Sequence, residues 1–455
     1  MIFERFYDES LSQASFLLGC PASGEAIVID PTWNLEQYIT FAEANALRIT
    51  HVTETHIHAD FASGARELSR RTGAQLFLTD EGDADWKYAF IAEGTPLHDG
   101  DVIQVGGIRL KAIHTPGHTP EHLTFAQLNG EDQVVALFTG DFVFAGDLGR
   151  PDLLETAAGH HGVMEASARR LFHSMSRLAD LPDDVLVWPG HGAGSACGKS
   201  LDGMPVTTLG AERKKNWGFQ VTEEEAFVQF ALVDQVEPPA YFAEMKRLNK
   251  LGLLREDLQF GPVRVGAGEL RAGIEAGRQI VDVRKLSWSM HDHLIGSILI
   301  PLGSGFTNWA GSLLSYDVDT LVLAASDVDA QTAILKLRMI GFTKVGAYAL
   351  ASGLPRGSTS KFPTVGADEV PDGTLLVDVR SAVERKSGAV PGSLHQPLYR
   401  LSVATSLPEE ECAVHCASGM RAVPAASLLR SRGVPAVAVN ASFKDIEQAA
   451  ASKSS

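Results

Sequence analysis

The sequence has little positive charge, few cysteines and no long apolar run, and each deficit excludes a class of protein. Its 39 lysines and arginines are outnumbered by 56 aspartates and glutamates, which gives a formal net charge of −17. Nucleic acids and anionic membrane surfaces require a basic face, so neither is expected as a partner. No stretch approaches the roughly 18 apolar residues of a membrane helix, so no membrane insertion is expected.

The scarcity of cysteine also limits the redox setting. The four cysteines are too few and too scattered for a disulfide framework: Cys20, Cys197, Cys412 and Cys416. Cys20 and Cys197 are expected to be small buried residues. Residues 1–20 lack a cationic start followed by an apolar run, so no secretory signal is expected and a cytoplasmic location is favoured. A chain of 455 residues suffices for about three domains.

In the first half, histidines and acidic residues gather where β-rich runs end. Six candidate metal ligands follow such runs: His56, His58, Asp60, His118, Asp141 and His191. The pattern His-x-His-x-Asp on a strand-to-loop turn aims two imidazoles and a carboxylate into one space. Any one of these residues could be a polar cap on a turn or helix. Six of them at strand ends, in one α/β region, indicate a metal site instead.

These segments resemble the metallo-β-lactamase superfamily over residues 1 to about 215. The resemblance implies a four-layer αββα sandwich that holds metal between its two sheets. In the two-zinc hydrolases of that superfamily the motif ends in a further histidine, where this chain has Phe61. A phenyl ring donates no lone pair, so a second metal site loses one ligand. The resemblance implies that the first site keeps three ligands, His56, His118 and Asp141, with three outer groups, His58, Asp60 and His191.

The expected ligands bear on the identity of the metal. Two imidazoles and one carboxylate, with other positions open, suit a single Fe(II) that must bind substrate and oxygen. Zinc that activates water tolerates the same ligands, so ligand type alone leaves both metals open. Around Arg150, and at 190–199 and 237–249, the chain is similar to bacterial persulfide dioxygenases. This similarity implies a substrate contact for Arg150, with an ordinary surface ion pair as the alternative.

The second half contains an internal repeat. Three segments recur in the same order: 280–288 (IVDVRKLSW) as 376–384 (LVDVRSAVE), 294–302 as 390–398, and one near 322–333 as one near 413–424. This order predicts two copies of one βα domain of roughly a hundred residues. Asp378 and Arg380 of the second copy are expected to support the fold. The expected domains are 1–252, 253–355 and 362–455.

The second copy carries a candidate catalytic loop. Cys416 follows a β-rich run and precedes a helix, so that backbone N–H groups, the helix end and Arg421 can stabilise a thiolate or a bound anion. We expect Cys416 and Arg421 to be catalytic, although a buried inert cysteine is the alternative. The residues between them are expected to bind substrate: Ala417, Ser418, Gly419 and Met420.

This loop, in a domain that also contains Asp-Val-Arg, resembles the loop of rhodaneses, which implies sulfur transfer through a cysteine persulfide. The first copy has different residues at the matching positions: Ala324, Asp327 and Asp329 in place of Cys416, Gly419 and Arg421. Alanine cannot carry sulfur and two carboxylates repel anions. We therefore expect the first copy to be catalytically silent, serving as a spacer or docking element.

As a whole, the chain resembles bacterial fusions of a persulfide dioxygenase with one silent and one active rhodanese domain. The resemblance implies that one Fe(II) per chain and O2 oxidise a low-molecular-weight thiol persulfide, such as that of glutathione or coenzyme A, to sulfite. Cys416 would transfer sulfur between persulfide, sulfite and thiosulfate, in sulfide oxidation and detoxification. A homo-oligomer is expected. The alternatives are a two-zinc hydrolase similar to glyoxalase II fused to a sulfurtransferase, and a non-enzymatic sulfur-relay or docking protein.

Overall fold

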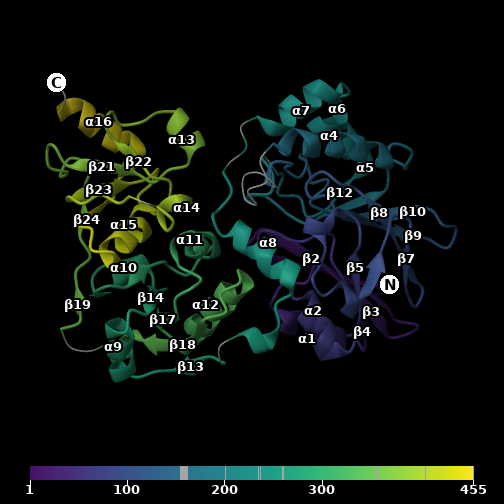
Figure 1. Ribbon diagram of the computed structural model, residues 1–455, viewed down its shortest axis with the longest axis horizontal. Coiled ribbons are helices and arrows are strands. Elements are labelled where there is room, and N and C mark those ends of the chain that lie inside the picture. Colours follow the sequence, from purple (N-terminus) through teal and green to yellow (C-terminus); the bar gives the residue numbers. More distant parts are fainter. Residues whose placement is uncertain are drawn as a thin grey trace. The chain divides into compact units, whose positions relative to one another are not determined.

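The structure, a computed structural model, describes residues 1–153, 162–199, 201–233, 235, 237–258, 261–354, 357–404 and 406–453 (Figure 1). The chain forms two compact units. Unit 1 comprises Met1–Pro238 and Phe242–Arg255, and unit 2 comprises Pro239–Tyr241 and Glu256–Ser455. Among the described residues, no helix has the length and apolar character needed to span a membrane.

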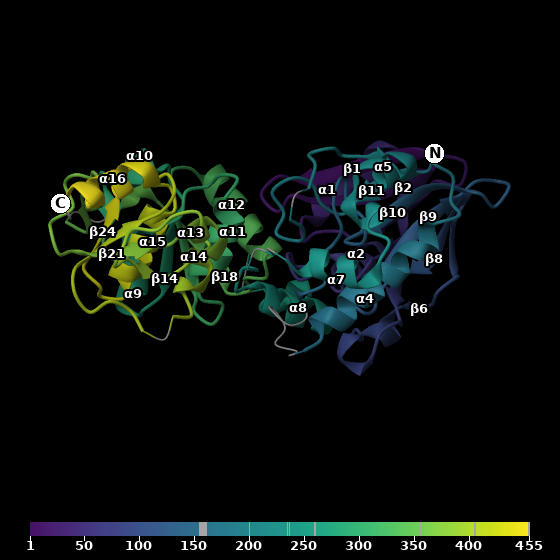
Figure 2. The same cartoon turned by 90° about the horizontal axis from the view of Figure 1, so that it is seen from above.

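Unit 1 contains two six-stranded sheets. The first has the order β1 (Ile2–Asp8), β2 (Gln13–Cys20), β3 (Glu25–Ile29), β4 (Arg48–Thr53), β5 (Gln75–Thr79) and β6 (Thr95–Leu97). The second has the order β12 (Thr207–Thr208), β11 (Leu186–Pro189), β10 (Val134–Gly140), β9 (Leu123–Leu128), β8 (Ile108–His114) and β7 (Val102–Val105). Strands β8, β9 and β10 run side by side in Figure 2.

Alternating apolar side chains make the two sheets pack face to face. On β2, Phe16 and Leu18 enter a core that also contains Phe138 of the second sheet. Leu17, which lies between them in sequence, points the other way, toward α1 (Leu35–Ala44) and α2 (Ala65–Thr72). This is the two-residue period of a strand that is buried on both faces.

Helices complete the sandwich on both outer faces. The second sheet is covered by α4 (Met164–Met175) and α7 (Glu224–Leu232), whose apolar residues share a core with β9, β10 and β11. In Figure 1, α4 and α7 lie on one side of the strands of unit 1, and α1 and α2 lie on the other. The layers therefore run helix, sheet, sheet, helix, as the sequence predicts. The other helices of unit 1 are α5 (Leu209–Lys215), α6 (Trp217–Gln220) and α8 (Phe242–Leu251), with short 3₁₀ turns at Ala84–Trp86, Ile91–Glu93 and Ser176–Leu178.

Unit 2 contains two lobes with the same strand order. The first lobe has β13 (Val263–Arg264), β18 (Val345–Leu350), β17 (Thr320–Ala324), β14 (Gln279–Asp282) and β16 (Ile298–Leu299). The second lobe has β20 (Thr364–Val365), β24 (Ala436–Val439), β23 (Cys412–His415), β21 (Leu375–Asp378) and β22 (Leu394–His395). In chain order, both sheets place their first, fifth, fourth, second and third strands side by side. All of these pairings are parallel, as in βα repeats.

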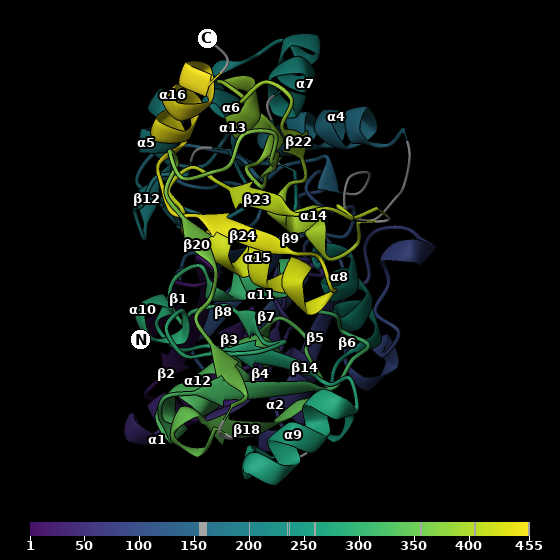
Figure 3. The same cartoon turned by 90° about the vertical axis from the view of Figure 1, so that its left-hand side faces the viewer.

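In each lobe, a helix follows the second, the third and the fourth strand of the sheet (Figure 3). Each lobe has one further helix, which lies between the first and second strands in the first lobe and after the fifth strand in the second lobe. The first lobe has α9 (Ala267–Glu275), α10 (Leu286–Ser289), α11 (Phe306–Leu313) and α12 (Asp327–Met339). The second has α13 (Ala382–Lys386), α14 (Leu398–Leu401), α15 (Ala422–Ser431) and α16 (Phe443–Lys453). A two-stranded pairing joins β15 (His293–Leu294) to β19 (Thr359–Ser360), and 3₁₀ turns lie at Arg255–Asp257 and Ala351–Gly353.

Strand register shows which residues of the two lobes correspond. Equivalent residues face the aspartate of the neighbouring strand: Leu323 opposite Asp282 in the first lobe, and His415 opposite Asp378 in the second. The next residues along these two strands are Ala324 and Cys416, which therefore occupy the same position. Alanine thus stands where the second lobe has its candidate nucleophile.

The connection that follows these two residues differs between the lobes. Helix α12 begins at Asp327, directly after Ser326, whereas α15 begins at Ala422, beyond a longer loop from Cys416. Both helices end at matching positions, Met339 and Ser431. The first lobe therefore has an additional helical turn where the second lobe has its loop.

The packing of the two sheets face to face predicts how much a core substitution between them destabilises unit 1. Phe138 is 1% exposed and contacts Phe16 with ring centroids 5.1 Å apart. We expect Phe138→Ala to lower the free energy of unfolding of unit 1 by about 3–5 kcal/mol, because the lost ring leaves a cavity between the sheets. Hydrogen exchange of amides in β9 and β10 measures this change. Val135, on the same strand, is 37% exposed, and Val135→Ala should cost less than about 1 kcal/mol. Equal losses in the two variants would contradict the assignment.

Candidate metal centre

The predicted ligands lie where strand ends of the two sheets meet. The loop after β4 carries His56, His58 and Asp60, the loop between β8 and β9 carries His118, and Asp141 and His191 follow β10 and β11. All six side chains are buried, with none more than 5% exposed. Backbone bonds join the sheets at this place: Leu123 N–H donates to Thr55 O at 2.7 Å, and Ala14 N–H donates to Gly190 O at 2.8 Å.

Three of these residues form a metal-binding site. The ligand atoms of His56, His118 and Asp141 all lie within 4.8 Å of one another. His56 Nε2 and both carboxylate oxygens of Asp141 are buried and have no hydrogen-bond partner among the described residues. Buried polar atoms without partners are rare and costly, and a cation would satisfy all three. The structure thus brings together the three ligands that the sequence predicts.

Outer partners fix which nitrogen each histidine offers. Four contacts engage the other ring nitrogen: His118 Nδ1 with Arg150 O at 3.0 Å, His191 Nδ1 with Ser12 O at 3.0 Å, His58 Nε2 with Asp30 at 3.0 Å, and His56 Nδ1 with Thr55 Oγ1 at 2.9 Å. Contacts of this kind set the tautomer and the ring orientation of metal ligands. Burial lowers the pKa of His56 well below its ordinary value, which keeps the imidazole neutral and able to bind a cation.

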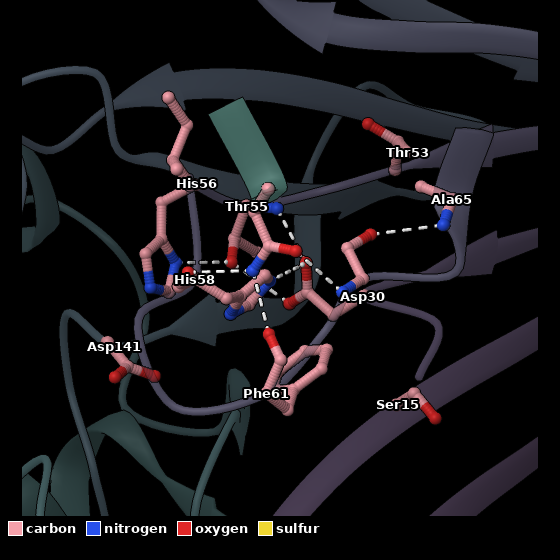
Figure 4. Close-up of polar contacts among 12 residues, drawn as sticks. Ser15, Asp30, Thr53, Thr55, His56, His58, Phe61, Ala65 and Asp141 are labelled. Atoms are coloured by element: carbon pink, nitrogen blue, oxygen red, sulfur yellow. Dashed lines mark hydrogen bonds and ion pairs between the residues drawn. The ribbon is translucent and has the colours of Figure 1, made fainter. Parts of the chain in front are cut away.

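Asp30, which the sequence analysis did not single out, organises the loop after β4. Its Oδ1 accepts hydrogen bonds from Thr55 N–H at 2.6 Å and from His58 Nε2 at 3.0 Å, and its Oδ2 accepts from Thr55 Oγ1 at 2.9 Å (Figure 4). Asp30 has a φ of +52°, a backbone conformation that aspartate and asparagine tolerate better than most residues. One buried carboxylate therefore positions the segment that carries two of the histidines.

Phe61 fills the space beside His58. Its ring is fully buried, and its centroid lies 4.4 Å from that of the His58 ring. Asn249 of α8 donates from Nδ2 to the carbonyl oxygens of His58 and Phe61, both at 2.7 Å. His58 is thus held from three directions, while its Nδ1 has no hydrogen-bond partner among the described residues. Phe61 therefore packs against the centre and offers it no ligand atom.

A second ligand group lies next to the first. The ligand atoms of Asp60, His191 and Cys197 are within 4.8 Å of one another, and His191 Nε2 is 3.3 Å from both Asp60 Oδ2 and Asp141 Oδ1. Burial, together with the charges of Asp141 and Asp60, raises the pKa of the Cys197 thiol well above its ordinary value. Cys197 is buried, as expected, but its place at the centre was missed. The available signal was its position in the strand-end loop that carries His191.

Arg150 contributes to the centre through its backbone. Its carbonyl oxygen binds His118, as described above. Its guanidinium is buried, and it donates to the Asp152 carboxylate from Nε at 2.8 Å and from Nη2 at 2.7 Å, and to Ala196 O from Nη1 at 3.0 Å. An ion pair was the alternative that the sequence analysis left open, but it was expected at the surface and the structure buries it. The substrate contact of Arg150 stays a prediction.

In unit 2, the structure brings Cys416 and Arg421 together at the end of β23. Cys416 is fully buried, Gly419 has a φ of +84°, and Arg421 directly precedes α15. Ser418 and Met420 are exposed, and the Ala417 carbonyl accepts a hydrogen bond from Phe443 N–H at 2.9 Å. Hydrogen bonds to the Glu384 carboxylate, with a smaller effect from the charge of the Cys416 thiolate, raise the pKa of Arg421. Glu384 is a further residue that the sequence analysis missed.

Comparisons with known proteins agree on the fold of unit 1. Residues 10–191 match the profile of the Metallo-beta-lactamase superfamily. A crystal structure described as a metallo-beta-lactamase from Staphylococcus aureus subsp. aureus COL is 38% identical, with a TM-score of 0.68, over 77% of this chain and 99% of that chain. Unit 1 makes up little more than half of the chain, so this similarity extends into unit 2.

Two curated relatives differ in their chemistry. A hydroxyacylglutathione hydrolase from Polaromonas sp. is 34% identical over 194 residues, which are 42% of this chain and 66% of the relative. A mitochondrial persulfide dioxygenase from Bos taurus is 28% identical over 230 residues, which are 50% of this chain and 78% of the relative. The chain thus spans about two thirds of the hydrolase, and each similarity leaves half or more of this chain unmatched.

The role of Asp30 is testable with a substitution that its backbone accepts. Asp30→Asn retains tolerance for positive φ but weakens the acceptor of His58 and Thr55, so we expect metal affinity to fall about 10- to 100-fold. Competition with a chelator measures the affinity. Asp132 also has a positive φ, of +62°, and lies in the exposed turn after β9, so Asp132→Asn is the matched control. Unchanged affinity in Asp30→Asn would show that Asp30 does not position the centre.

Proposed function

Because this chain belongs to the metallo-β-lactamase superfamily, we propose that its metal centre binds one Fe(II) and serves to oxidise a low-molecular-weight thiol persulfide with O2 to sulfite. The observation that carries this proposal is the set of three buried ligands, His56, His118 and Asp141, beside a phenylalanine in place of a further histidine. The proposal extends to unit 2, where Cys416 would transfer sulfur between persulfide, sulfite and thiosulfate.

The ligand set fits Fe(II). Two imidazoles and one carboxylate on one face are typical of non-haem iron oxygenases, and they leave room for two further ligands. A bound Fe(II) supplies the activation of O2, which no side chain provides. The chain's own part is to hold the three ligands in place and to orient the persulfide. Arg150 contributes by fixing His118 through its carbonyl oxygen.

The surroundings of the centre suit a reactive sulfur species. Phe61 and Phe144 are fully buried, and the Phe144 ring centroid lies 6.0 Å from that of His191. Apolar rings and the burial of all candidate ligands limit the access of bulk water. Limited access favours oxidation of the bound persulfide to sulfite over its hydrolysis or its release unreacted. The similarity to the bovine persulfide dioxygenase supports this choice of substrate class.

The chemistry proposed for Cys416 needs no oxidant. Its thiolate attacks the outer sulfur of a thiol persulfide, the sulfur–sulfur bond breaks, and the carrier thiolate leaves with the electron pair. Sulfite then attacks the outer sulfur of the Cys416 persulfide, forms thiosulfate and restores the Cys416 thiolate. Sulfite is the product proposed for unit 1, so one unit would supply a reactant of the other.

A second function has support from a specific observation. Asp60, His191 and Cys197 offer ligand atoms for a second metal, and the hydroxyacylglutathione hydrolase relative is 34% identical. Two zinc ions at these sites would activate water for thioester hydrolysis. Phe61 argues against this function, because the position that a further histidine would fill has no donor atom.

Metal content separates the two functions. We expect one iron per chain after anaerobic loading with Fe(II) and removal of excess metal, measured by elemental analysis. Cys197→Ser should leave that content unchanged, because the single iron is held by His56, His118 and Asp141. Two zinc ions per chain, with one lost in Cys197→Ser, would instead establish the dinuclear hydrolase.

The two units should lose their activities separately. We expect His118→Ala to abolish O2 uptake with glutathione persulfide while cyanide-dependent consumption of thiosulfate remains, because the iron site loses a ligand and Cys416 is intact. Cys416→Ser should have the opposite effect. An oxygen electrode and a colorimetric thiocyanate assay measure the two activities.

Matched controls exist for both substitutions. His114 contacts Pro120 O through Nε2 at 2.8 Å and belongs to neither ligand group, so His114→Ala should keep O2 uptake. Cys412 is buried at the start of β23, the strand that Cys416 follows, so Cys412→Ser should keep sulfur transfer. Undiminished O2 uptake in His118→Ala would refute the metal assignment, and undiminished sulfur transfer in Cys416→Ser would refute the role of Cys416.

A further inference from the structure

Comparison of the two lobes of unit 2 distinguishes the ion pairs that both lobes share from those that are present in one lobe. Arg284 pairs with Asp282 at 2.7 Å in the first lobe, and Arg380 pairs with Asp378 at 2.8 Å in the second. All four side chains are buried, and they occupy matching positions at the ends of β14 and β21. An ion pair kept in both lobes, although only the second lobe has a cysteine after β23, belongs to the shared fold.

A second ion pair is found only in the lobe with Cys416. Arg421 donates to the Glu384 carboxylate from Nη2 at 2.6 Å and from Nη1 at 2.8 Å. Helices α10 and α13 begin at matching positions, so Glu384 corresponds to Trp288, which is 56% exposed. By strand register, Arg421 corresponds to Asp329. Both partners of this ion pair are therefore replaced in the lobe that lacks the cysteine.

Glu384 limits the positive charge that the Cys416 loop presents. Hydrogen bonds from Arg421 lower the pKa of Glu384 to about 2, so its carboxylate is ionised at any working pH. Two further arginines of the second lobe, Arg380 and Arg385, both donate hydrogen bonds to the Asp378 carboxylate. Arg421 lies five residues beyond Cys416 on the same loop, and both terminal nitrogens of its guanidinium are occupied by the Glu384 carboxylate.

We propose that Glu384 is a specificity-determining residue of the Cys416 site, which acts through Arg421 to favour organic persulfides over dianionic thiosulfate as sulfur donors. This inference rests on the sulfur transfer proposed above. In both reactions the Cys416 thiolate attacks the outer sulfur and the sulfur–sulfur bond breaks. The leaving group is an organic thiolate in one case and sulfite in the other. A fixed carboxylate paired with Arg421 of the Cys416 loop repels the dianion more than it repels a donor with an uncharged carrier.

Glu384 also has a structural contact that the test must separate from its charge. It is the third residue of a capping box at the start of α13, in which Ser381 N–H donates to Glu384 Oε2 at 2.9 Å and Glu384 N–H donates to Ser381 Oγ at 3.2 Å. Glutamine serves in a capping box as glutamate does, so Glu384→Gln removes the charge and keeps the cap. Ser381→Ala weakens the cap and keeps the charge.

The experiment compares two donors in the full-length protein. The kcat/KM for sulfur transfer to cyanide is measured with thiosulfate and with the persulfide of 2-mercaptoethanol, for wild type, Glu384→Gln and Ser381→Ala. In Glu384→Gln we expect the thiosulfate-to-persulfide ratio to rise about five- to tenfold at low ionic strength, mainly through a lower KM for thiosulfate. The change should shrink in about 1 M NaCl, where charges are screened within a few ångströms. Ser381→Ala should keep the wild-type ratio.

Each outcome bears on the inference. An unchanged or lower ratio in Glu384→Gln, while wild type transfers sulfur from both donors, would overturn the role of Glu384 and leave the proposed function intact. An equal rise in Ser381→Ala would assign the effect to the helix cap and would also overturn it. Wild-type protein that transfers sulfur from neither donor would instead overturn the proposed function of Cys416, and the inference with it.

Discussion

The packing of the two sheets of unit 1 against each other fixes the position of every metal ligand. His56 belongs to the first sheet, and His118 and Asp141 belong to the second, so the centre exists only while the sheets keep their register. The hydrogen bond from Leu123 N–H to Thr55 O joins the two sheets one residue from His56. Because a close-packed aromatic core lies directly behind this bond, small shifts of either sheet would reach the ligands.

The same burial that shapes the centre makes its polar groups costly, and outer contacts offset that cost. Asp30 binds two groups of the loop after β4, while backbone carbonyls of Arg150 and Ser12 bind His118 and His191. Asp30 holds its position with a positive φ, a conformation that costs about 1 kcal/mol or more in non-glycine residues. The atoms that remain without partners face the centre, which is where a cation would bind.

Sequence reasoning reached the parts of this site that follow local rules. Polar residues at strand ends predicted a metal site among six residues, and the resemblance to the metallo-β-lactamase superfamily implied the two sheets and the three ligands His56, His118 and Asp141. Sequence reasoning missed Asp30, which lies in no motif and reaches the centre only through tertiary packing, and it assigned Cys197 to the core although Cys197 lies in the segment 190–199 that carries His191. The guanidinium of Arg150 pairs with Asp152, a buried partner that the sequence analysis, which allowed for a surface ion pair, did not name.

The internal repeat shows how the two lobes differ in sequence, and the structure shows how they differ in backbone. Sequence comparison showed that the first lobe lacks a cysteine, but it did not show that the loop is replaced by helix. Ser326 caps α12 through a bond from Asp329 N–H at 3.1 Å, and the Asp327 carboxylate accepts a hydrogen bond from Tyr348 OH at 2.7 Å. The first turn of α12 is therefore held by its own side chains where the second lobe has Gly419 to Arg421. A cysteine at position 324 alone would find carboxylates and a closed helix end in place of an open loop with a cation, so the two lobes differ in backbone as well as in their nucleophile.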